Sequence, residues 1–469
     1  MKIKLIALLT VLLMLAAFAA GCNGETPPPA GNSPSPGGES PSPNDPGGPG
    51  GTELEATITY AIWGDREIAQ KEIDNFNKAF PKITVELVDL IPGVSELFAA
   101  AGARELPDVF WVSETPTLVT NKILYDLKPM LDPDPDFSAD NFFHGIGTLT
   151  TYNDRTYALP LNFYAEGVVF VNKDMLADHN IPFPGADWTY DDFVDILQRL
   201  TRPGENQFGL QSSRDIRLFM YQNINPSLGY HTFCTETMKF NFTDHAYAQA
   251  SEMARDIAFS QNLSTDFLTN RQLADMYGMT ADGGIADPLW QGKVAMSIGT
   301  SLRINVYRDY ANFEWDILPL PKINAQRLAL IPDYIGVSAA TQHPEASYEF
   351  VKWMSFSRQG WMDRLDMHAD MGMPYLSFPV TRDRDVWDKF LASPYIPDGM
   401  SALLNLIPSG YVEGFKWLPG WDQAIRASDG RYGVQFFEGT AFPSDHAAEM
   451  EQSANREIQD AMDALAASQ

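Results

Sequence analysis

The sequence contains only two cysteines, Cys22 and Cys234, in 469 residues. This excludes a fold that depends on a disulfide framework, and a chain of this length can bury a core large enough to be stable without one. Cys234 lies in the aromatic-rich stretch HTFCTETMKF. We therefore interpret Cys234 as a small hydrophobic residue buried in the core.

Basic residues are scarce, because 33 lysines and arginines stand against 61 acidic residues and give a formal net charge of −28. Nucleic-acid phosphates need a basic face, so this composition argues against nucleic acid as a partner. It permits neutral or cationic ligands. The total charge does not choose between these ligands, because only the charges that line a site decide what binds there.

Motifs for metal, nucleotide and nucleophile chemistry are also missing. The seven histidines show neither an H-E-x-x-H pattern nor paired metal-ligand spacing. The chain has no Walker loop, no G-x-S-x-G and no G-x-G-x-x-G. The acidic run Asp132–Asp136 is similar to a calcium loop, but Phe137 stands where glycine is required and Phe143 where the bidentate glutamate belongs. We expect no cofactor and no metal.

Long apolar runs are confined to the N-terminus. Lys2 and Lys4 precede the apolar run Leu5–Phe18, which is followed by Ala19-Ala20-Gly21. This order is typical of a secretory signal peptide over residues 1–21, and the run is too short to span a membrane comfortably. No later segment has enough uninterrupted apolar residues to form a span.

Cys22 directly follows these small residues and resembles the lipobox cysteine of bacterial lipoproteins, which is acylated and becomes the first residue of the mature chain. Ala19 stands where that motif usually has leucine, and an ordinary cleaved signal is the alternative. Residues 22–54 continue with proline, glycine and serine and almost no aliphatics, a composition that cannot offset its chain entropy by burial. We expect a disordered linker that tethers the folded part to the extracellular face of the cell membrane through lipid at Cys22.

Residues 55–469 exceed what one hydrophobic core usually serves, so we expect two domains. Their first part alternates between strand and helix patterns, which predicts an α/β fold with a mostly parallel sheet. The expected elements are a strand at Thr57–Ile62, a helix whose apolar face is Ala69, Ile73, Phe76 and Phe80 and which ends at Pro81, a strand at Ile83–Val88, a helix at Glu96–Ala103, a strand at Pro107–Val112 and a helix at Thr117–Ile123.

Later segments give further local predictions. Asn153-Asp154 lies between two strand-like runs and predicts a hairpin. Thr189, with Asp192 three residues on, predicts a helix that begins with a capping box. The remaining expectations are strands at Val168–Val171, Lys293–Ile298 and Phe313–Ile317, a helix from Pro344 to Met354, and an amphipathic helix from Ser444 whose apolar face is Ala447, Met450, Ile458, Ala461, Met462 and Leu465.

Taken in order, these blocks resemble the family 1 extracellular solute-binding proteins of carbohydrate ABC transporters, the relatives of maltose-binding protein. The blocks that carry the resemblance are TITYAIWGD with EIDNFNKAFPKITVELV, LPDVFWVSE, RTYALP with VVFVNKDML, DWTYDDFVDILQRLT, QGKVAMSIGTSL and HPEASYEFVKWM. Together they span about residues 57–465.

The resemblance implies a two-lobed periplasmic-binding-protein-like fold with hinge crossovers and a cleft between the lobes. It implies that the chain crosses from one lobe to the other near Pro160–Asn162, near Pro332–Tyr334 and near Met371–Pro374. The expected N-terminal lobe is then 55–161 plus 333–372, and the C-terminal lobe is 162–332 plus 373–469.

Aromatic and acidic residues follow two strands of the first lobe. Trp63 and Asp65 end the first strand, and Trp111 with Glu114 ends the third. Ligands of open α/β sheets collect beyond the carboxyl ends of strands, where rings cover the C–H faces of a sugar and carboxylates bind its hydroxyls. The alternatives are that Trp63 is a core residue and that Asp65 caps the following helix.

The resemblance places further candidates in or near the cleft. Leu302 occupies a position where the family often has an aromatic platform, which argues against long maltodextrin-like ligands. The aromatic, glycine-rich segment 411–421 either packs a long loop onto the core or supplies stacking from the second lobe. The further candidates are Tyr164, Glu166, Ser301, Arg303, Asp333, Tyr334, Trp417 and Trp421.

The resemblance implies a monomeric receptor that binds a sugar or oligosaccharide and delivers it to ABC permease subunits, with the lipid anchor as its only membrane contact. Three alternatives stay open. One is a secreted glycoside hydrolase that uses paired carboxylates such as Asp65 and Glu114. Another is a surface adhesin without a closable cleft. The third is a receptor for an acidic saccharide or for a small cation such as a polyamine.

Overall fold

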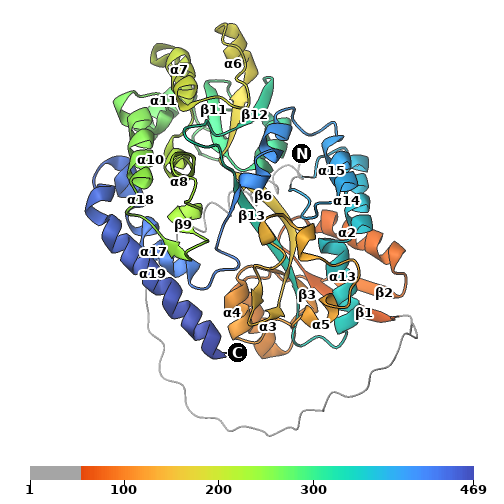
Figure 1. Cartoon of the computed structure of the whole chain (residues 1–469). Helices are drawn as coiled ribbons and strands as arrows, with labels where there is room; N and C mark the ends of the chain where they lie inside the picture. The colour runs from red at the N-terminus through yellow and green to blue at the C-terminus, as the bar shows by residue number, and fades with distance from the viewer. Residues whose placement is uncertain (1–53, 376, 469) are drawn as a thin grey trace.

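The computed structural model describes residues 54–375 and 377–468. The predicted signal peptide, Cys22 and nearly all of the predicted linker lie outside these residues. Among the described helices, none combines the length and the apolar character needed to cross a membrane. Two sheets, each covered by helices, form the two halves of the molecule (Figure 1).

The first sheet has the strand order β14-β13-β3-β1-β2, with β6 paired to β13. Strand β1 is parallel to both β2 and β3, as the alternating pattern predicts, whereas β13 is antiparallel to β3. Helix α13 packs on β13 and β1, and α2 packs on β2 and α14. The strands are β1 (Ala56–Ala61), β2 (Ile83–Leu87), β3 (Val109–Val112), β6 (Leu159–Glu166), β13 (Ala329–Val337) and β14 (Tyr411–Val412). The helices around this half are α2 (Arg66–Ala79), α3 (Val94–Ala103), α4 (Thr115–Thr120), α5 (Lys128–Leu131), α13 (Pro344–Ser355), α14 (Arg358–Asp370) and α15 (Arg384–Leu391).

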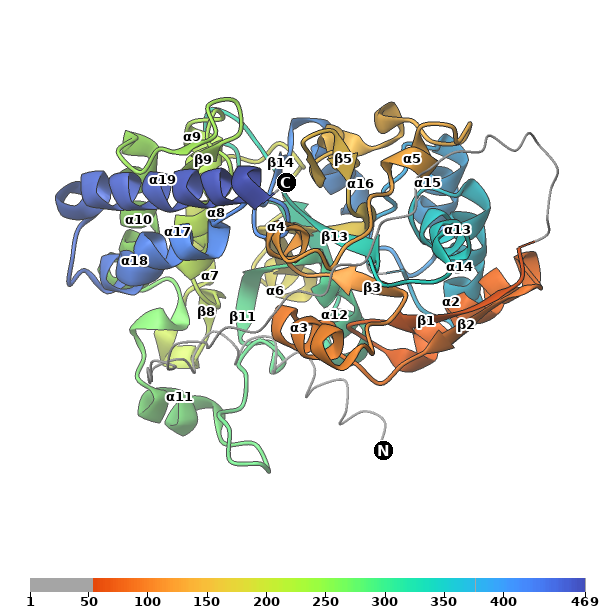
Figure 2. The same cartoon turned by 90° about the horizontal axis from the view of Figure 1, so that it is seen from below.

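The second sheet has the order β12-β7-β11-β8. Seen from below, the long helix α19 runs beside α17 and α18 on the outer side of this half, and its last turns reach α4 of the first half (Figure 2). The strands are β7 (Val168–Asn172), β8 (Phe208–Leu210), β11 (Val294–Gly299) and β12 (Trp315–Pro319). The helices are α6 (Lys173–Asp178), α7 (Tyr190–Leu200), α8 (Arg214–Phe219), α9 (Tyr221–Ile224), α10 (His245–Arg255), α11 (Asn270–Tyr277), α12 (Ile304–Tyr310), α16 (Met400–Leu404), α17 (Trp421–Ala427), α18 (Asp429–Glu438) and α19 (Pro443–Ser468).

Two long strands connect the halves. β6 and β13 pair antiparallel from Leu159↔Ile335 to Glu166↔Ala329, with an irregular register between Asp333 and Tyr334. β6 then turns at Gly167, whose positive φ of 72° suits glycine, and continues as β7 of the second sheet. Figure 1 shows β6 and β13 between the two halves. The fold is therefore the predicted two-lobed one with strand crossovers, while the residue boundaries of the lobes stay a prediction.

Local signals predicted the starts of two helices, α2 and α7, correctly. Asp65 is the N-cap of α2, and its Oδ1 accepts hydrogen bonds from the backbone N–H of Glu67 at 2.7 Å and of Ile68 at 3.3 Å. Thr189 and Asp192 form the reciprocal capping box that begins α7. Both motifs involve only residues two or three positions apart, so the sequence alone determines them.

The Asn153-Asp154 hairpin is also confirmed. β4 (Thr151–Tyr152) and β5 (Arg155–Thr156) pair antiparallel around it. Asn153 and Asp154 both have positive φ, 46° and 62°, as a tight primed turn requires. The two short strands are minor elements of the fold, but Tyr152 donates its hydroxyl hydrogen to the backbone oxygen of Trp417 at 2.5 Å. The hairpin therefore anchors the segment that follows β14.

Several local expectations were wrong in detail. Helix α3 begins at Val94 rather than at Glu96. Helix α4 begins at Thr115 rather than at Thr117, because Pro116 fits the first turn of a helix. Met462 is 37% exposed, although other residues of the predicted apolar face, such as Met450 and Ile458, are buried. Cys234 is half-buried, with Sγ 3.6 Å from Oε2 of Glu236, because the short strand β9 (Phe233–Cys234) turns only Phe233 fully inward.

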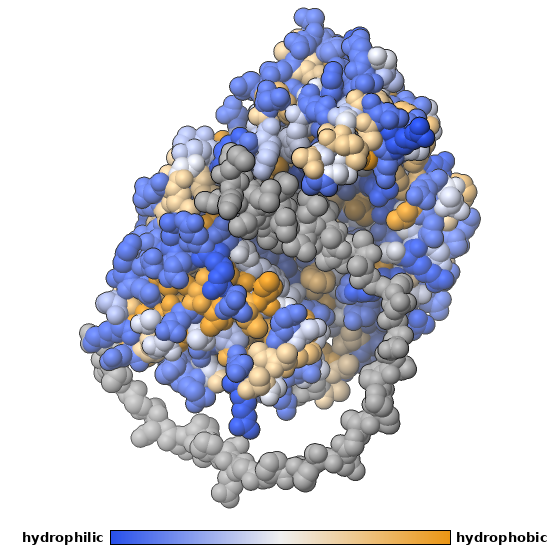
Figure 3. Space-filling view, turned by 180° about the vertical axis from the view of Figure 1, so that it is seen from behind, coloured by the Kyte–Doolittle hydropathy of each residue, from blue (hydrophilic) through white to orange (hydrophobic). Residues whose placement is uncertain are grey.

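Aromatic clusters lie at the centre of both halves. In the first, Phe76 meets Phe350 edge to face at 5.0 Å and Tyr60 meets the same ring at 4.9 Å. In the second, Trp421 contacts Phe233 at 5.6 Å and Phe240 at 5.3 Å. Outside these cores the surface seen from behind is mostly hydrophilic, with one hydrophobic patch in its lower half (Figure 3).

Candidate functional site

A cavity of about 560 Å³ lies where the carboxyl ends of β1 and β3 meet α12 of the second half. Its volume is within the range of small-molecule sites. The first half contributes Trp63 and Asp65 after β1, Glu72 of α2, Trp111 of β3, Asn162 of β6, and Arg364, His368 and Tyr375 in and after α14. The second half contributes Leu302, Asn305, Val306, Arg308, Asp309 and Tyr310.

Two tryptophans form one wall of this cavity. Trp63 and Trp111 are both half-buried and stand edge to face, with ring centroids 6.2 Å apart and planes at 76°. Trp111 Nε1 donates a hydrogen bond to the hydroxyl oxygen of Tyr60 at 2.6 Å. Burial holds the pKa of Tyr60 well above its ordinary value, and the charge of Glu72 adds to this effect. The neutral Tyr60 hydroxyl therefore fixes the orientation of the Trp111 ring.

Asp65 lines the same cavity from the N-terminus of α2. Its side chain is exposed and caps the helix through Oδ1. The predicted capping role is thus confirmed. Contact of Asp65 with a ligand, like that of Trp63 and Trp111, stays a prediction that its position supports.

The arginines of the cavity are paired with acids of the cavity. Nε of Arg364 lies 3.1 Å from Oε1 of Glu72, and the Arg364 guanidinium stacks 4.3 Å from the ring centroid of Trp361. Burial raises the pKa of Glu72, while the charge of Arg364 acts to lower it. Arg308 Nε donates to Oδ1 of Asp309 at 3.0 Å. The lining therefore offers no arginine without an opposite charge beside it.

Several buried polar atoms of the cavity residues have no hydrogen-bond partner among the described residues, although buried polar groups are nearly always paired in native structures. They come from both halves of the molecule. The atoms are Asn162 Oδ1, Asn305 Oδ1, Arg308 Nη1, Arg364 Nη1 and His368 Nε2. A ligand rich in donors and acceptors would satisfy them.

One of these atoms, His368 Nε2, is a hydrogen-bond acceptor. Its Nδ1 lies 3.2 Å from the carbonyl oxygen of Pro374, which can only accept a hydrogen bond, so Nδ1 carries the proton. Burial lowers the pKa of His368 to about 4, with the positive charge of Arg364 acting in the same direction. The ring is therefore neutral at pH 7, and its unpaired Nε2 is an acceptor.

The cavity residues on two helices were not predicted from the sequence. Arg364 and His368 are four residues apart on α14, and Asn305, Arg308 and Asp309 share one face of α12. The only signal was a polar face at helical spacing, which usually points to solvent. Nothing local indicates that these faces lie against a cavity.

Three other predicted residues, Tyr164, Glu166 and Asp333, meet in a second place along the crossing strands. Asn162, Tyr164 and Glu166 alternate along β6, so their side chains share one face and lead away from the cavity. Asp333 of β13, the strand partner of Asn162, lies beside them, and its Oδ1 is 2.5 Å from Nζ of Lys416. None of Tyr164, Glu166 and Asp333 lines the cavity itself.

Three residues that were not predicted individually, Tyr230, Glu413 and Lys416, complete a polar cluster. We define this polar cluster as Tyr164, Glu166, Tyr230, Asp333, Glu413 and Lys416. Tyr230 donates its hydroxyl hydrogen to Oε2 of Glu166. Glu413 accepts a hydrogen bond from the backbone N–H of Phe415 and is 5% exposed. Burial raises the pKa of both Glu166 and Glu413 to about 7.

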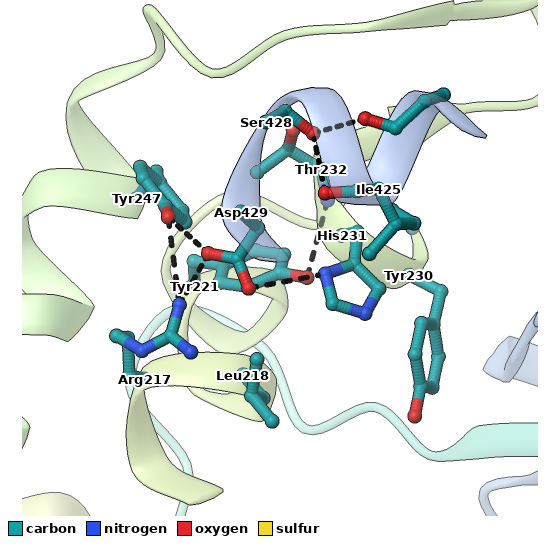
Figure 4. A network of polar contacts seen from close by, with 12 residues as sticks. Arg217, Leu218, Tyr221, Tyr230, His231, Thr232, Tyr247, Ile425, Ser428 and Asp429 are labelled. Atoms are coloured by element: carbon teal, nitrogen blue, oxygen red, sulfur yellow. Dashed lines mark hydrogen bonds and ion pairs between the residues drawn. The ribbon is translucent and has the colours of Figure 1, made fainter. Parts of the chain in front are cut away.

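A buried network in the second half lies beside Tyr230 (Figure 4). Asp429 accepts hydrogen bonds from Arg217 and from the hydroxyl of Tyr247, and its Oδ2 lies 3.5 Å from Nδ1 of His231. Burial acts to raise the pKa of Asp429, but Arg217 and the neighbouring donors hold it far below its ordinary value. The network joins α8, α10 and α18 to the turn that carries Tyr230 and His231.

The remaining predicted residues have structural partners of their own. Glu114 lies outside the cavity lining and accepts a hydrogen bond from Oγ1 of Thr117 at 2.8 Å. Ser301 is fully buried and accepts from the backbone N–H of Ala165 at 3.1 Å. Arg303 lies over the ring of Tyr307, with its Cζ 5.8 Å from the centroid.

Tyr334, Trp417 and Trp421 are core residues. Tyr334 is fully buried and donates to the backbone oxygen of Ile146 at 3.3 Å. Trp417 Nε1 donates to the backbone oxygen of Glu413 at 2.5 Å. Trp421 packs in the second aromatic cluster and is 4% exposed. Of the two alternatives for segment 411–421, the structure therefore has the one in which it packs onto the core.

Comparison with known proteins agrees with this architecture. An uncharacterized lipoprotein of the oleD 5′ region of Streptomyces antibioticus is 22% identical over 326 residues, which is 66% of this chain and 68% of that protein. The structure of the ABC substrate-binding protein Lmo0181 of Listeria monocytogenes in complex with cycloalternan superposes with a TM-score of 0.67 at 18% identity and covers 87% of this chain and all of that one.

A second solved structure has the same fold. It is an ABC transporter solute-binding protein of Thermotoga lettingae bound to α-D-tagatose, with a TM-score of 0.64, 16% identity and coverage of 86% of this chain and 100% of that one. Residues 60–360 match the bacterial extracellular solute-binding proteins as a family. The two-lobed fold, the cavity between its halves and this match lead to one conclusion: the chain belongs to the family of bacterial extracellular solute-binding proteins.

Proposed function

We propose that the protein binds a saccharide in the cavity between its lobes and delivers it to the permease subunits of an ABC importer. The observation that carries this proposal is the cavity itself. It combines two tryptophan rings at a steep angle with unpaired hydrogen-bonding atoms from both lobes. Rings cover the C–H faces of a sugar, and the unpaired atoms bind its hydroxyls.

The charges of the cavity favour a sugar unit without charge at this position. Arg364 faces Glu72, and Arg308 faces Asp309. A uronic acid or a polyamine would have to displace one of these partners. The related structures named above, bound to cycloalternan and to tagatose, support a carbohydrate ligand.

Closure of the lobes is the step that couples binding to delivery. Asn162 and Trp111 come from one lobe and Asn305 from the other, so a ligand held by all of them favours the closed state. β6 and β13 are the segments about which the lobes would move. We propose that the protein acts as a monomer and needs no cofactor.

The glycoside hydrolase alternative has less support. It requires two carboxylates at the ligand. Of the predicted pair, Asp65 lines the cavity, but Glu114 does not and is held by Thr117. The other carboxylates of the lining, Glu72 and Asp309, are paired with Arg364 and Arg308. We therefore propose binding without turnover.

Anchoring by lipid at Cys22 completes the proposal. The similarity to a lipoprotein of Streptomyces antibioticus supports it. The test is metabolic labelling with a radioactive fatty acid. Label and membrane association are expected for the unsubstituted chain and not for Cys22→Ser, and release of both forms into the medium would contradict the anchor.

The central experiment is a thermal-shift screen with a library of saccharides, combined with chromatography of the incubated sugars. A ligand at 100 times its Kd stabilises the folded state by about 2.7 kcal/mol. We expect a saccharide that raises Tm and is recovered unchanged. Turnover would show an enzyme, and no stabilisation by any saccharide would refute the proposal.

Trp63→Ala provides the site-specific arm of this experiment. Loss of its stacking contact is expected to reduce the affinity for the identified saccharide by about tenfold. The matched control is Phe183→Ala, because Phe183 is an exposed aromatic, 37% accessible, that does not line the cavity. Equal affinity of the two variants for the saccharide would mean that the saccharide does not bind against Trp63.

A further inference from the structure

The polar cluster on the crossing strands has more negative than positive groups. Glu166, Asp333 and Glu413 face a single lysine, Lys416. Lys416 is engaged by Asp333 at 2.5 Å and by the backbone oxygen of Pro332 at 3.0 Å. Its ammonium is therefore paired with Asp333. The two glutamates have no cation of their own within the cluster.

Glu413 is the residue that points to a missing partner. It is 5% exposed, and its Oε2 has no hydrogen-bond partner among the described residues. The charges that act on it are those of Lys416, Glu166 and Asp333, so its carboxylate faces the cluster. A buried carboxylate oxygen without a donor is costly unless a ligand supplies one.

The chemistry of the cluster selects the kind of donor. No group of three or more acidic, histidine or cysteine side chains within the described residues is close enough to hold a metal ion. A protonated amine has several N–H donors on one nitrogen and needs no tight coordination sphere. Tyr164 adds an aromatic ring that already has the Lys416 ammonium 6.0 Å from its centroid, so the site is one that accepts ammonium groups.

The cluster continues directly from the cavity. Asn162 lines the cavity, and Tyr164 and Glu166 follow on the same strand face at about 7 Å per step of two residues. Tyr164, Glu166 and Asp333 are only half-buried, so this face remains accessible. A ligand whose uncharged ring lies against Trp63 and Trp111 would therefore extend toward Glu166 and Glu413.

We infer that the ligand is a saccharide with a protonated amino group, and that Glu166 and Glu413 bind this group beside the cavity. The inference rests on the proposed function, because it adds a charged substituent to the sugar that the cavity holds. It makes the cluster a specificity determinant for amino sugars over their neutral counterparts. The hydroxyl of Tyr230 orients Glu166 for this contact, and the neighbouring His231 is held by Asp429.

The test is calorimetry of the full chain with matched pairs of probes: glucosamine and glucose, galactosamine and galactose, and the β1,4-linked glucosamine dimer and cellobiose. The amine of at least one pair is expected to bind at least tenfold more tightly than its neutral partner. Binding of neutral members without any amine preference would overturn this inference alone. Absence of binding by every sugar here and in the saccharide library would overturn the proposed function with it.

The variant Glu413→Gln tests whether the polar cluster causes the preference for the amine over its neutral partner. It is expected to remove the amine preference and to leave the affinity for the neutral partner unchanged, whereas Glu86→Gln, which removes an exposed charge on β2, is expected to change neither. If Glu413→Gln does not fold, Glu166→Gln keeps an oxygen for Tyr230 and gives the same test. An amine preference that survives in the folded variant would overturn the inference.

The pH dependence gives an independent readout. Glu166 and Glu413 have pKa values raised to about 7, so both ionise as the pH rises from 6 to 8. The titratable groups that face them come from every element packed around the cluster. They are Tyr164 of β6, Asp215 of α8, Tyr230 before β9, Asp333 and Tyr334 of β13, Tyr411 of β14, and Lys416. The amine preference is expected to be largest near pH 7 and at least threefold smaller at pH 5 and at pH 9, because the glutamates are protonated at the lower pH and the amino group of an amino sugar, with a pKa of about 7.5 to 8 like that of an α-amino group, loses its proton at the higher pH. Neutral sugars are expected to bind equally throughout. A flat amine preference would contradict the assignment.

Discussion

Trp111 and Tyr60 are joined by a hydrogen bond of 2.6 Å from the indole Nε1 to the hydroxyl oxygen, although the two residues lie on different strands. Tyr60 is 1% exposed and packs against Phe350 in the first aromatic cluster. The ring that faces the cavity is thus also a part of the core. This relationship changes what substitution of Trp111 is expected to do.

Trp111→Ala is expected to abolish saccharide binding and also to reduce the free energy of unfolding by about 2 kcal/mol or more, because it removes half-buried ring area and leaves the Tyr60 hydroxyl unpaired. Trp111→Phe keeps a ring and is expected to cost less than the alanine variant. Urea unfolding and calorimetry check both changes; an alanine variant as stable as the unsubstituted protein would show that the ring is not part of the core.

Arg364→Met is expected to destabilise the protein by about 3–5 kcal/mol, because it leaves Glu72 without its partner in a buried site. The folded-state pKa of Glu72 is raised, so its contribution to stability falls as the pH rises above the ordinary carboxyl value. Without Arg364 the pKa rises further, and the variant should lose more stability at pH 8 than at pH 5.

Two further variants control for this result. Arg384→Met removes an exposed helix pair with Asp388 and is expected to cost less than about 1 kcal/mol. The double variant Arg364→Met, Glu72→Gln should be more stable at pH 8 than Arg364→Met alone. Equal stability of the single and double variants would mean that the two charges are not coupled.

His368 makes the protein less stable in mild acid. Its folded-state pKa is lowered to about 4, against an ordinary value of about 6.5, so the unfolded chain binds a proton that the folded chain does not. Stability is therefore lost as the pH falls through this window, by up to about 3 kcal/mol. His368→Gln should be less sensitive to acid between pH 6.5 and 4.5 in urea titrations, and parallel curves for the two proteins would contradict the assignment.

Asp429→Asn is expected to cost about 3–5 kcal/mol, because it leaves the Arg217 guanidinium in a buried site without its counter-ion. Tyr247→Phe removes only one hydrogen bond to the same carboxylate and should cost about 1 kcal/mol. The Asp429 pKa is depressed in the folded state, so the stability that this group provides is lost only as the pH falls below the ordinary aspartate value. Thermal unfolding at pH 7 ranks the variants, and Asp422→Asn, at an exposed helix pair, is the control.

Much of the scaffold follows from local sequence. The cap at Asp65, the capping box at Thr189 and the hairpin at Asn153-Asp154 depend on contacts between residues two to five positions apart, which the sequence shows directly. The two-lobed fold with strand crossovers followed from the family resemblance, because six blocks in the right order leave few alternative folds. Trp63, Asp65 and Trp111 were found because they end parallel strands, where ligand sites form.

Only the tertiary structure decided which of the other candidates lie near a cavity. The Arg364–Glu72 pair joins helices that are far apart in the chain, and the segment with Trp417 and Trp421 packs inward because aromatic surface is available on β9 and its neighbours. The pattern of a helix shows which residues share a face, but whether that face meets solvent, core or a cavity depends on segments that the chain brings there from elsewhere. The sequence thus determined the family and the strand ends, and the packing of α2, α12 and α14 determined the site.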